Sequence, residues 1–251
     1  MLASKTMMKS PIQLGVTGVF TALVCVVTMV FSIYVPSTRG FFNIGETMVY
    51  ITALLFGPFV GAFAGGVGSM FADVLLGYYY YAPATLVIKA LEGGLVGFLS
   101  RKKPLFSKYH TRREWKIFTF EIGVLVGALV SLIGFLYYSG IVELYSGIPP
   151  PESPTSTIFI PMEFWLGLGA FVALLITVIA FVSEPEIGWT VISIIFGGLL
   201  MVSGYFLYEQ LLLGVFAVAE VPVNIGQMTI GLIVATPIVK IIQRTLPQLK
   251  S

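Results

Sequence analysis

Charged side chains interrupt the apolar segments of this 251-residue sequence at a few positions. Asp73 comes near the end of one apolar segment, and Lys89 and Glu92 come early in the next. A charged side chain inside a bilayer costs about 2.5–3.5 kcal/mol, so it indicates a functional site by default. Antiparallel packing would bring Asp73 and Lys89 to a similar depth, where they could pair, and the spacing of Lys89 and Glu92 permits a second ion pair. The predicted chemistry is polar recognition of a ligand, and the alternative is a structural salt-bridge network.

Other polar residues fall near the same ends of their segments. These candidates for substrate binding are Asn43, Glu46, Glu209, Glu220, Asn224 and Gln227. The acidic ones could instead lie in the headgroup region of the bilayer. Asn224 and Gln227 share one helical face, where they could bond a heterocycle or an amide, or could hold two helices together. The concentration of polar groups at one end predicts a pocket that opens to that side of the membrane.

A run of four tyrosines begins at Tyr78 and ends at Tyr81, directly before Pro83. Tyrosines are enriched at membrane interfaces, so the run is typical of an aromatic belt. The alternative is a wall that stacks on a ring-shaped ligand, with Tyr78 as a substrate-binding candidate.

Small residues recur at four-residue spacing in three segments. The longest stripe is Gly57, Gly61, Gly65, Ser69, Asp73 and Gly77. Shorter ones are Gly18 with Ala22 and Gly93 with Gly97. Small residues let helices approach closely, so each stripe faces either a neighbour within the chain or a partner protein.

The composition predicts an all-α, polytopic integral membrane bundle. Apolar residues make up 57% of the chain, charged residues 10%, and the mean hydropathy is +0.96, which excludes a soluble or disordered protein. We expect eight crossings, at residues 12–35, 44–56, 59–76, 84–100, 117–138, 162–182, 187–213 and 222–242. The second and third are shorter than a full span, which predicts tilt, local thinning or partial crossings next to a pocket.

The positions of the basic residues predict the orientation. Twelve of the 14 Lys and Arg fall before the first segment, in the loop 101–116, or at the end of the chain. Eight alternating crossings put all three regions on one side, which the positive-inside rule makes cytoplasmic. The expected location is the plasma membrane, with both termini inside. Only Arg39 lies in the outward-facing loops.

Several kinds of chemistry have no motif in the chain. One cysteine, Cys25, and one histidine, His110, make metal centres and disulfides improbable, and no Gly-Lys dipeptide is present for a Walker A loop. A net charge of +2 does not indicate nucleic acid. We expect no cofactor, no metal and no enzyme activity. The alternatives are an intramembrane lipid enzyme that uses Asp73, Lys89 and Glu92, and a structural membrane protein without a ligand.

Three stretches carry a resemblance to a known family: FFNIGETMVYITALLFGPFVGAFAGGVGSMFADVLLGY at 41–78, APATLVIKALEGGLVGFL at 82–99, and GGLLMVSGYFLYE with AEVPVNIGQ within 197–227. They resemble the S components of energy-coupling-factor (ECF) vitamin transporters, in particular the riboflavin-type branch. The resemblance implies a small helical protein, usually of six helices, that captures a water-soluble vitamin near the outer face. It also implies docking on a transmembrane coupling protein driven by two ATPases. Gly18 and Ala22 match the family's docking pattern loosely.

The middle of the chain departs from that family. Residues 117–186 form an expected extra helical hairpin, whose two crossings preserve the orientation of the flanking segments. The single membrane domain, 1–251, then consists of helices one to four at 12–100, the basic loop 101–116, the hairpin 117–186 and the last two helices at 187–245. The loops around 36–43 and 77–83 are expected to close over the substrate.

Overall fold

The structure is a computed structural model that describes residues 11–35, 40–102, 112–144, 153–154, 156–182, 185–214, 217 and 220–247. The described residues form eight helices: α1 (Pro11–Val30), α2 (Glu46–Phe56), α3 (Pro58–Leu76), α4 (Ala82–Ser100), α5 (Arg112–Tyr138), α6 (Met162–Val182), α7 (Pro185–Leu213) and α8 (Glu220–Thr245). They also form four short strands: β1 (Ser32–Val35), β2 (Gly40–Asn43), β3 (Gly140–Leu144) and β4 (Ser156–Ile160). The predicted helical bundle is confirmed.

The first helix is shorter than predicted, because α1 ends at Val30 and the chain continues as strand β1. β1 pairs antiparallel with β2, with Ser32 opposite Asn43 and Val35 opposite Gly40. Ile33, Tyr34 and Val35 are β-branched or aromatic residues that favour a strand, and a proline follows them in the sequence. The prediction of one continuous helix over 12–35 is therefore wrong at its end.

A second strand pair lies in the segment 140–161, which the sequence analysis left as a loop. β3 and β4 pair antiparallel, with Gly140 opposite Ile160 and Leu144 opposite Ser156. Gly140 begins β3 with φ +95°, a conformation that favours glycine. This allows the chain to turn directly from α5 into the strand.

Helix α2 covers only part of a membrane crossing. It has 11 residues, whereas α1, α3, α4, α5, α7 and α8 are long and apolar enough to span a bilayer. The turn at Gly57 after α2 lies next to Arg101 at the end of α4. At about 1.5 Å per residue, the start of α2 at Glu46 lies about 15 Å from that end, inside the bundle. Strand β2 comes directly before α2 and lies toward the other end of the bundle.

Glycines hold α3 and α4 close together. A Cβ on Gly61 would lie 2.8 Å from the carbonyl oxygen of Gly93, and one on Gly65 would lie 2.9 Å from that of Lys89. A Cβ on Gly97 would lie 2.6 Å from the backbone of Pro58. The stripes in these two segments therefore pack within the chain. Helix α1 differs, because a Cβ on Gly18 would meet no atom within 4 Å.

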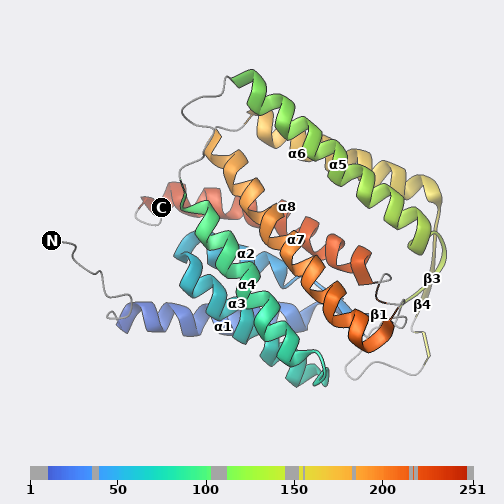
Figure 1. The fold of residues 1–251 in the computed structure, drawn as a ribbon, viewed down its shortest axis with the longest axis horizontal. Coiled ribbons are helices and arrows are strands. Elements are labelled where there is room, and N and C mark those ends of the chain that lie inside the picture. Colours follow the sequence, from blue (N-terminus) through green and yellow to red (C-terminus); the bar gives the residue numbers. More distant parts are fainter. Residues whose placement is uncertain are drawn as a thin grey trace.

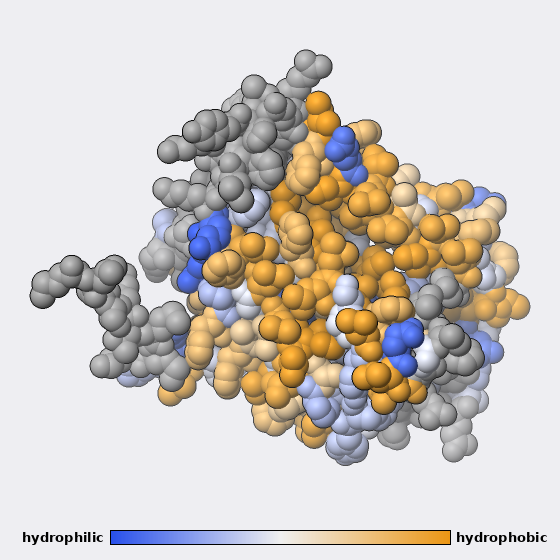
Figure 2. All heavy atoms as spheres, viewed as in Figure 1, coloured by the Kyte–Doolittle hydropathy of each residue, from blue (hydrophilic) through white to orange (hydrophobic). Residues whose placement is uncertain are grey.

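Figure 1 shows two groups of helices. Helices α5 and α6 lie side by side as one pair, and their contacts with the rest of the bundle are chiefly with α7 and α8. Helix α1 begins and α8 ends at one end of the bundle, and the strands lie at the opposite end (Figure 1). Figure 2 shows apolar residues over most of one face, as expected for a surface that contacts lipid. The protein is a multi-pass membrane protein.

Candidate functional site

A polar cavity lies in the half of the bundle that carries the strands. Strand β2, the start of α2, the ends of α3 and α7, and the starts of α4 and α8 contribute to its wall. The cavity has a volume of about 40 Å³. Eight of the ten predicted substrate-binding residues line it: Asn43, Glu46, Asp73, Lys89, Glu209, Glu220, Asn224 and Gln227. Their assignment to a ligand stays a prediction, but the structure brings them to one place.

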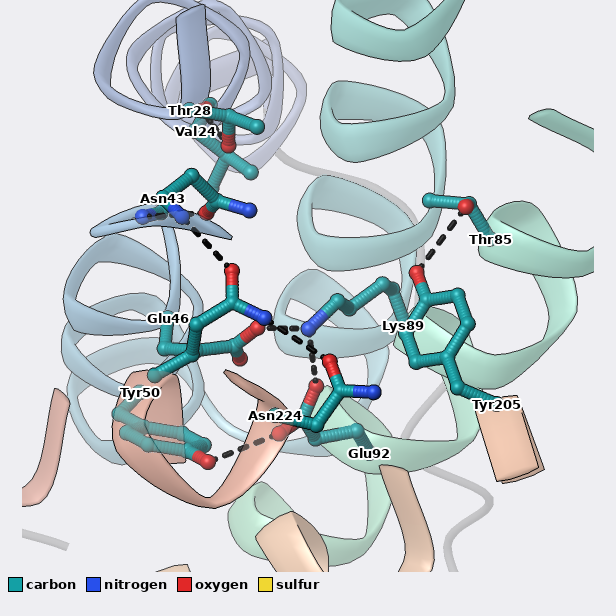
Figure 3. Close-up of polar contacts among 12 residues, drawn as sticks. Val24, Thr28, Asn43, Glu46, Tyr50, Thr85, Lys89, Glu92, Tyr205 and Asn224 are labelled. Atoms are coloured by element: carbon teal, nitrogen blue, oxygen red, sulfur yellow. Dashed lines mark hydrogen bonds and ion pairs between the residues drawn. The ribbon is translucent and has the colours of Figure 1, made fainter. Parts of the chain in front are cut away.

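An ion-paired group forms the floor of the site. Lys89 donates to the carboxylate of Glu46 on α2 and to Oε2 of Glu92, one turn along α4, at 3.1 Å. The hydroxyl of Tyr50 donates to Oε1 of Glu92 at 2.8 Å. Figure 3 shows Glu46 on α2 reaching Lys89 on α4, with Glu92 between Lys89 and Tyr50. Because all three charged groups are buried, their pairing offsets the cost of removing them from water.

The predicted pairing of Lys89 with Asp73 is wrong. Among the described residues, the ion pairs of Lys89 go to Glu46 and Glu92. Asp73 lies on the cavity wall and is joined to Thr85 by a side-chain hydrogen bond. Tyr205 also donates to Thr85, at 3.0 Å. The antiparallel turn between α3 and α4 predicted the depth of Asp73 along α3. The partner of Lys89 depends instead on how α2 and α7 pack against α4.

Carboxylates on three other helices form the rest of the acidic wall. Asp73, Glu209 and Glu220 are each at least 95% buried. Glu209 accepts a hydrogen bond from the Tyr81 hydroxyl at 3.0 Å, and the charge of Glu220 acts on Glu209. The alternative in which the glutamates lie in the headgroup region therefore does not hold, since their side chains are inside the bundle.

Amide groups connect the site to the β1–β2 hairpin. Gln227 donates from Nε2 to Oδ1 of Asn224 at 2.9 Å, which confirms that the two residues share a face of α8. Oε1 of Gln227 accepts from the backbone N–H of Asn43 at 2.9 Å, and Asn43 Oδ1 accepts from the N–H of Gly45 at 2.8 Å. Gln227 thus ties strand β2 to α8 across the cavity.

The tyrosine run divides between two environments. Tyr78 and Tyr81 are buried, whereas Tyr79 and Tyr80 are exposed. Tyr81 lines the cavity, and Tyr78 lies beside it with its ring centroid 4.6 Å from that of Phe41 on β2. Burial, the largest cause, raises the pKa of both hydroxyls, so they remain hydrogen-bond donors at neutral pH. Within the run, Tyr81 is the residue on the cavity wall, and the aromatic belt stays a prediction for the exposed pair.

Two predicted residues are not on the cavity wall: Tyr78, in the layer above it, and Glu92, beneath Lys89. The sequence analysis also missed several lining residues, namely Thr28, Phe41, Ser69, Thr85 and Tyr205. Hydroxyl and aromatic residues occur throughout membrane helices, so their types alone did not separate them from packing residues. The small-residue stripe that places Ser69 four residues before Asp73 was the one available indication.

Comparison with known proteins gives the chain a family. The model of the S component of ECF-type riboflavin transporters matches residues 8–179, about two thirds of the chain. The chain belongs to this family. The match includes α1–α5 and most of α6, and it ends before α7 and α8. The chain is accordingly a transporter component of the membrane and not an enzyme, which sets aside the lipid-enzyme alternative.

Two relatives each align with half of the chain. An uncharacterized protein in a gap 3′ region of Pyrococcus woesei is 36% identical over 140 residues, which is 86% of its length. The thiamine precursor transporter HmpT of Lactococcus lactis subsp. cremoris (strain MG1363) is 25% identical over 126 residues, or 69% of its length. The similarity to HmpT agrees with a transport protein for a vitamin-type compound.

Proposed function

We propose that the protein is the substrate-capture subunit of an ECF-type importer and binds a water-soluble, vitamin-type compound from outside the cell. The observation that carries the proposal is the buried polar cavity beneath the β1–β2 hairpin, in a chain that belongs to the S-component family. Riboflavin is the first compound to test because the family is described by it. A thiamine precursor is the second, because HmpT is described as its transporter.

The proposed orientation puts the cavity on the extracellular side. The helix ends that adjoin the basic stretches of the sequence, namely the start of α1 and the ends of α4 and α8, lie at one end of the bundle, and the cavity lies toward the other (Figure 1). The positive-inside rule makes the basic end cytoplasmic. In a Cys25→Ser background, a cysteine at Ser107, which lies outside the described residues, should react with a membrane-impermeant thiol reagent only after the cells are opened. Reaction in intact cells would reverse the orientation.

The outer end of the cavity acts as a lid in this proposal. A cavity of about 40 Å³ holds only about three water molecules, so a vitamin requires movement of the surrounding segments. The β1–β2 hairpin is held over the site by the Asn43–Gln227 hydrogen bond and the Phe41–Tyr78 contact. Separation of these two contacts would open a path from the outer surface. Residues 36–39 of the expected closing loop 36–43 lie outside the described residues.

The proposed docking face for the coupling protein and its two ATPases is on α1. Gly18 and Ala22 are exposed, and Gly18 has open space where a side chain would begin. Internal packing therefore does not account for this stripe, unlike those on α3 and α4. Leucine at both positions should abolish uptake and leave ligand binding by the isolated protein unchanged. Equal loss of both properties would contradict the docking role.

One experiment tests the central proposal. The protein is purified in detergent, and the small molecules that co-purify are identified by mass spectrometry. We expect a water-soluble compound that stabilises the purified protein and whose uptake by cells requires the coupling protein. A protein that binds no water-soluble compound would instead fit the alternative of a structural membrane protein.

A further inference from the structure

We infer that the captured compound is an organic cation, bound between the carboxylates of Asp73 and Glu209 and the tyrosine rings of the cavity. The inference rests on the proposed function and narrows its substrate class. It assigns to the site a ligand with a positively charged, N–H-bearing group, such as an amine, an amidine or a protonated aminopyrimidine.

The charge balance of the site gives the first argument. Five buried carboxylates, on Glu46, Asp73, Glu92, Glu209 and Glu220, belong to the site, and Lys89 is its one cation among the described residues. Lys89 is already engaged by Glu46 and Glu92. Asp73 and Glu209 therefore have no cation of their own within the described part of the chain. Buried charge is stable only when an opposite charge or a full set of hydrogen bonds offsets it, so a cationic ligand completes the site.

Individual oxygen atoms give a second, independent argument. Within the part of the chain that the structure describes, Asp73 Oδ2, Glu209 Oε2 and Glu46 Oε2 are buried and accept no hydrogen bond. The three side chains are 4%, 1% and 1% exposed and line the cavity. More than nine in ten buried polar groups in proteins have a partner, so three exceptions around one cavity indicate missing donors. Ammonium and amidinium groups carry donors and no acceptors, which is what these oxygens require.

The aromatic residues indicate an organic cation rather than a metal ion. Tyr81 and Tyr205 line the cavity with ring centroids 6.4 Å apart, and aromatic faces attract organic cations. Lys89 uses the Tyr205 ring in this way, with Nζ 5.6 Å from the centroid. Among the described residues, no three acidic, histidine or cysteine side chains are grouped closely enough to hold a metal ion. The acidic groups come instead from several elements around the cavity.

The test separates small molecules by charge. A yeast extract is passed over a cation-exchange resin at pH 7, and the retained fraction, the unretained fraction and riboflavin alone are each added to the purified protein. Thermal stabilisation is measured in detergent. We expect the retained fraction to stabilise the protein, and the unretained fraction and riboflavin to have no effect. Stabilisation by riboflavin or by the unretained fraction alone would overturn the inference and leave the proposed function intact. Stabilisation by none of the three would contradict the proposed function itself.

Variants then connect the effect to the site. Asp73→Asn and Glu209→Gln keep the shape of each side chain and remove its charge. Each should require about ten- to a hundredfold more of the retained fraction for half-maximal stabilisation. Each should also raise the melting temperature of the ligand-free protein, because a buried charge has been removed. Glu121→Gln, which neutralises an exposed carboxylate on α5, is the control and should change neither value. If both fractions stabilise the wild-type protein, the two variants decide between the outcomes. Weaker stabilisation of the variants by the retained fraction alone supports the inference, and equally weaker stabilisation by both fractions overturns it.

Discussion

The α3–α4 and α5–α6 pairs bring their helices together by the same means but differ in what they bury. A Cβ on Gly61 would lie 2.8 Å from the Gly93 carbonyl oxygen in the first pair, and one on Gly123 would lie 2.9 Å from that of Ala173 in the second. Yet α3 and α4 bury Asp73, Lys89 and Glu92, whereas the charged side chains described on α5 and α6 are exposed. Close packing by small residues is therefore a property of the bundle, and the buried charges identify the site.

The neighbouring elements explain the difference. Helices α2, α7 and α8 contribute further polar residues to the cavity that α3 and α4 line. These residues are Glu46, Glu209, Glu220, Asn224 and Gln227. The α5–α6 pair buries an apolar cluster of Val126, Val172 and Ile176. A charged group can stay in a membrane bundle where other helices supply its partners, so the charges are concentrated where several elements meet. The comparison predicts that substitutions of polar residues around the α3–α4 pair affect stability and ligand binding more than substitutions in the α5–α6 pair.

The largest expected effect is the loss of the one lysine in the cavity. Lys89→Ala leaves Glu46 and Glu92 buried without their cation, which should lower the free energy of unfolding by about 3–5 kcal/mol. Denaturant titration in detergent measures this. Adding Glu46→Gln should recover part of the loss, because one of the orphaned charges is removed. Lys102→Ala, at an exposed lysine over the Phe98 ring, should cost less than about 1 kcal/mol. Equal losses at the two lysines would contradict a structural role of the buried group.

The packing shared by the two pairs should respond equally to added volume. Gly61→Ala and Gly123→Ala each push a methyl group against backbone, and each should cost about 1–3 kcal/mol of unfolding free energy. Gly167→Ala on α6 meets nothing within 4 Å, so it should stabilise by about 0.5–1 kcal/mol through helix propensity. Melting temperatures of the three variants test this, and a tolerant Gly123→Ala would show that the second pair is packed more loosely.

The amide pair on α8 should affect binding more than folding. Asn224→Ala removes the acceptor of the Gln227 side chain and a polar group of the cavity wall. A lost hydrogen bond with a buried partner costs about 1–3 kcal/mol, which corresponds to about 5- to 150-fold in affinity for the co-purified ligand. Gln227→Ala should weaken binding as well, because it also frees β2 from α8. Ser131→Ala, between α5 and α6, is the control. Calorimetry that gives wild-type affinity for both α8 variants would remove this helix from the ligand site.

The sequence predicted the helices well because about 20 apolar residues in a row have few alternatives in a membrane. The strands were missed for opposite reasons. β1 continues the apolar run of α1 without a polar break, and β3 and β4 border a Pro/Ser/Thr-rich loop. Their β-branched residues were the available indication.

The sequence predicted most of the charged and amide residues that line the cavity, but it did not predict all of the contacts between them. Charged and amide side chains cost free energy inside a membrane, so their presence in an apolar segment indicates a site. For this reason eight of the ten candidates line one cavity. The predicted pair of Lys89 with Glu92 is confirmed. The pairing of Lys89 with Asp73 was wrong because depth along two helices does not determine which third helix packs against them. Tyr50 was missed because a tyrosine in an apolar helix has the composition of an ordinary core residue, although its hydroxyl donates to Glu92.

The smallest expected effect compares one hydrogen bond in each region. Trp165 Nε1 donates to the carbonyl oxygen of Tyr138 at 3.0 Å and so joins α6 to the end of α5. Trp165→Phe leaves a neutral, partly buried acceptor and should cost about 0.5–1.5 kcal/mol, with ligand affinity unchanged. Tyr50→Phe leaves a fully buried carboxylate oxygen without its donor and should cost about 1.5–3 kcal/mol. Unfolding titrations of the two variants measure the ratio. If Trp165→Phe lowers the free energy of unfolding as much as Tyr50→Phe, or weakens ligand binding, then the α5–α6 pair is coupled to the site. In that case the pair belongs to the binding machinery although it buries no charge among the described residues.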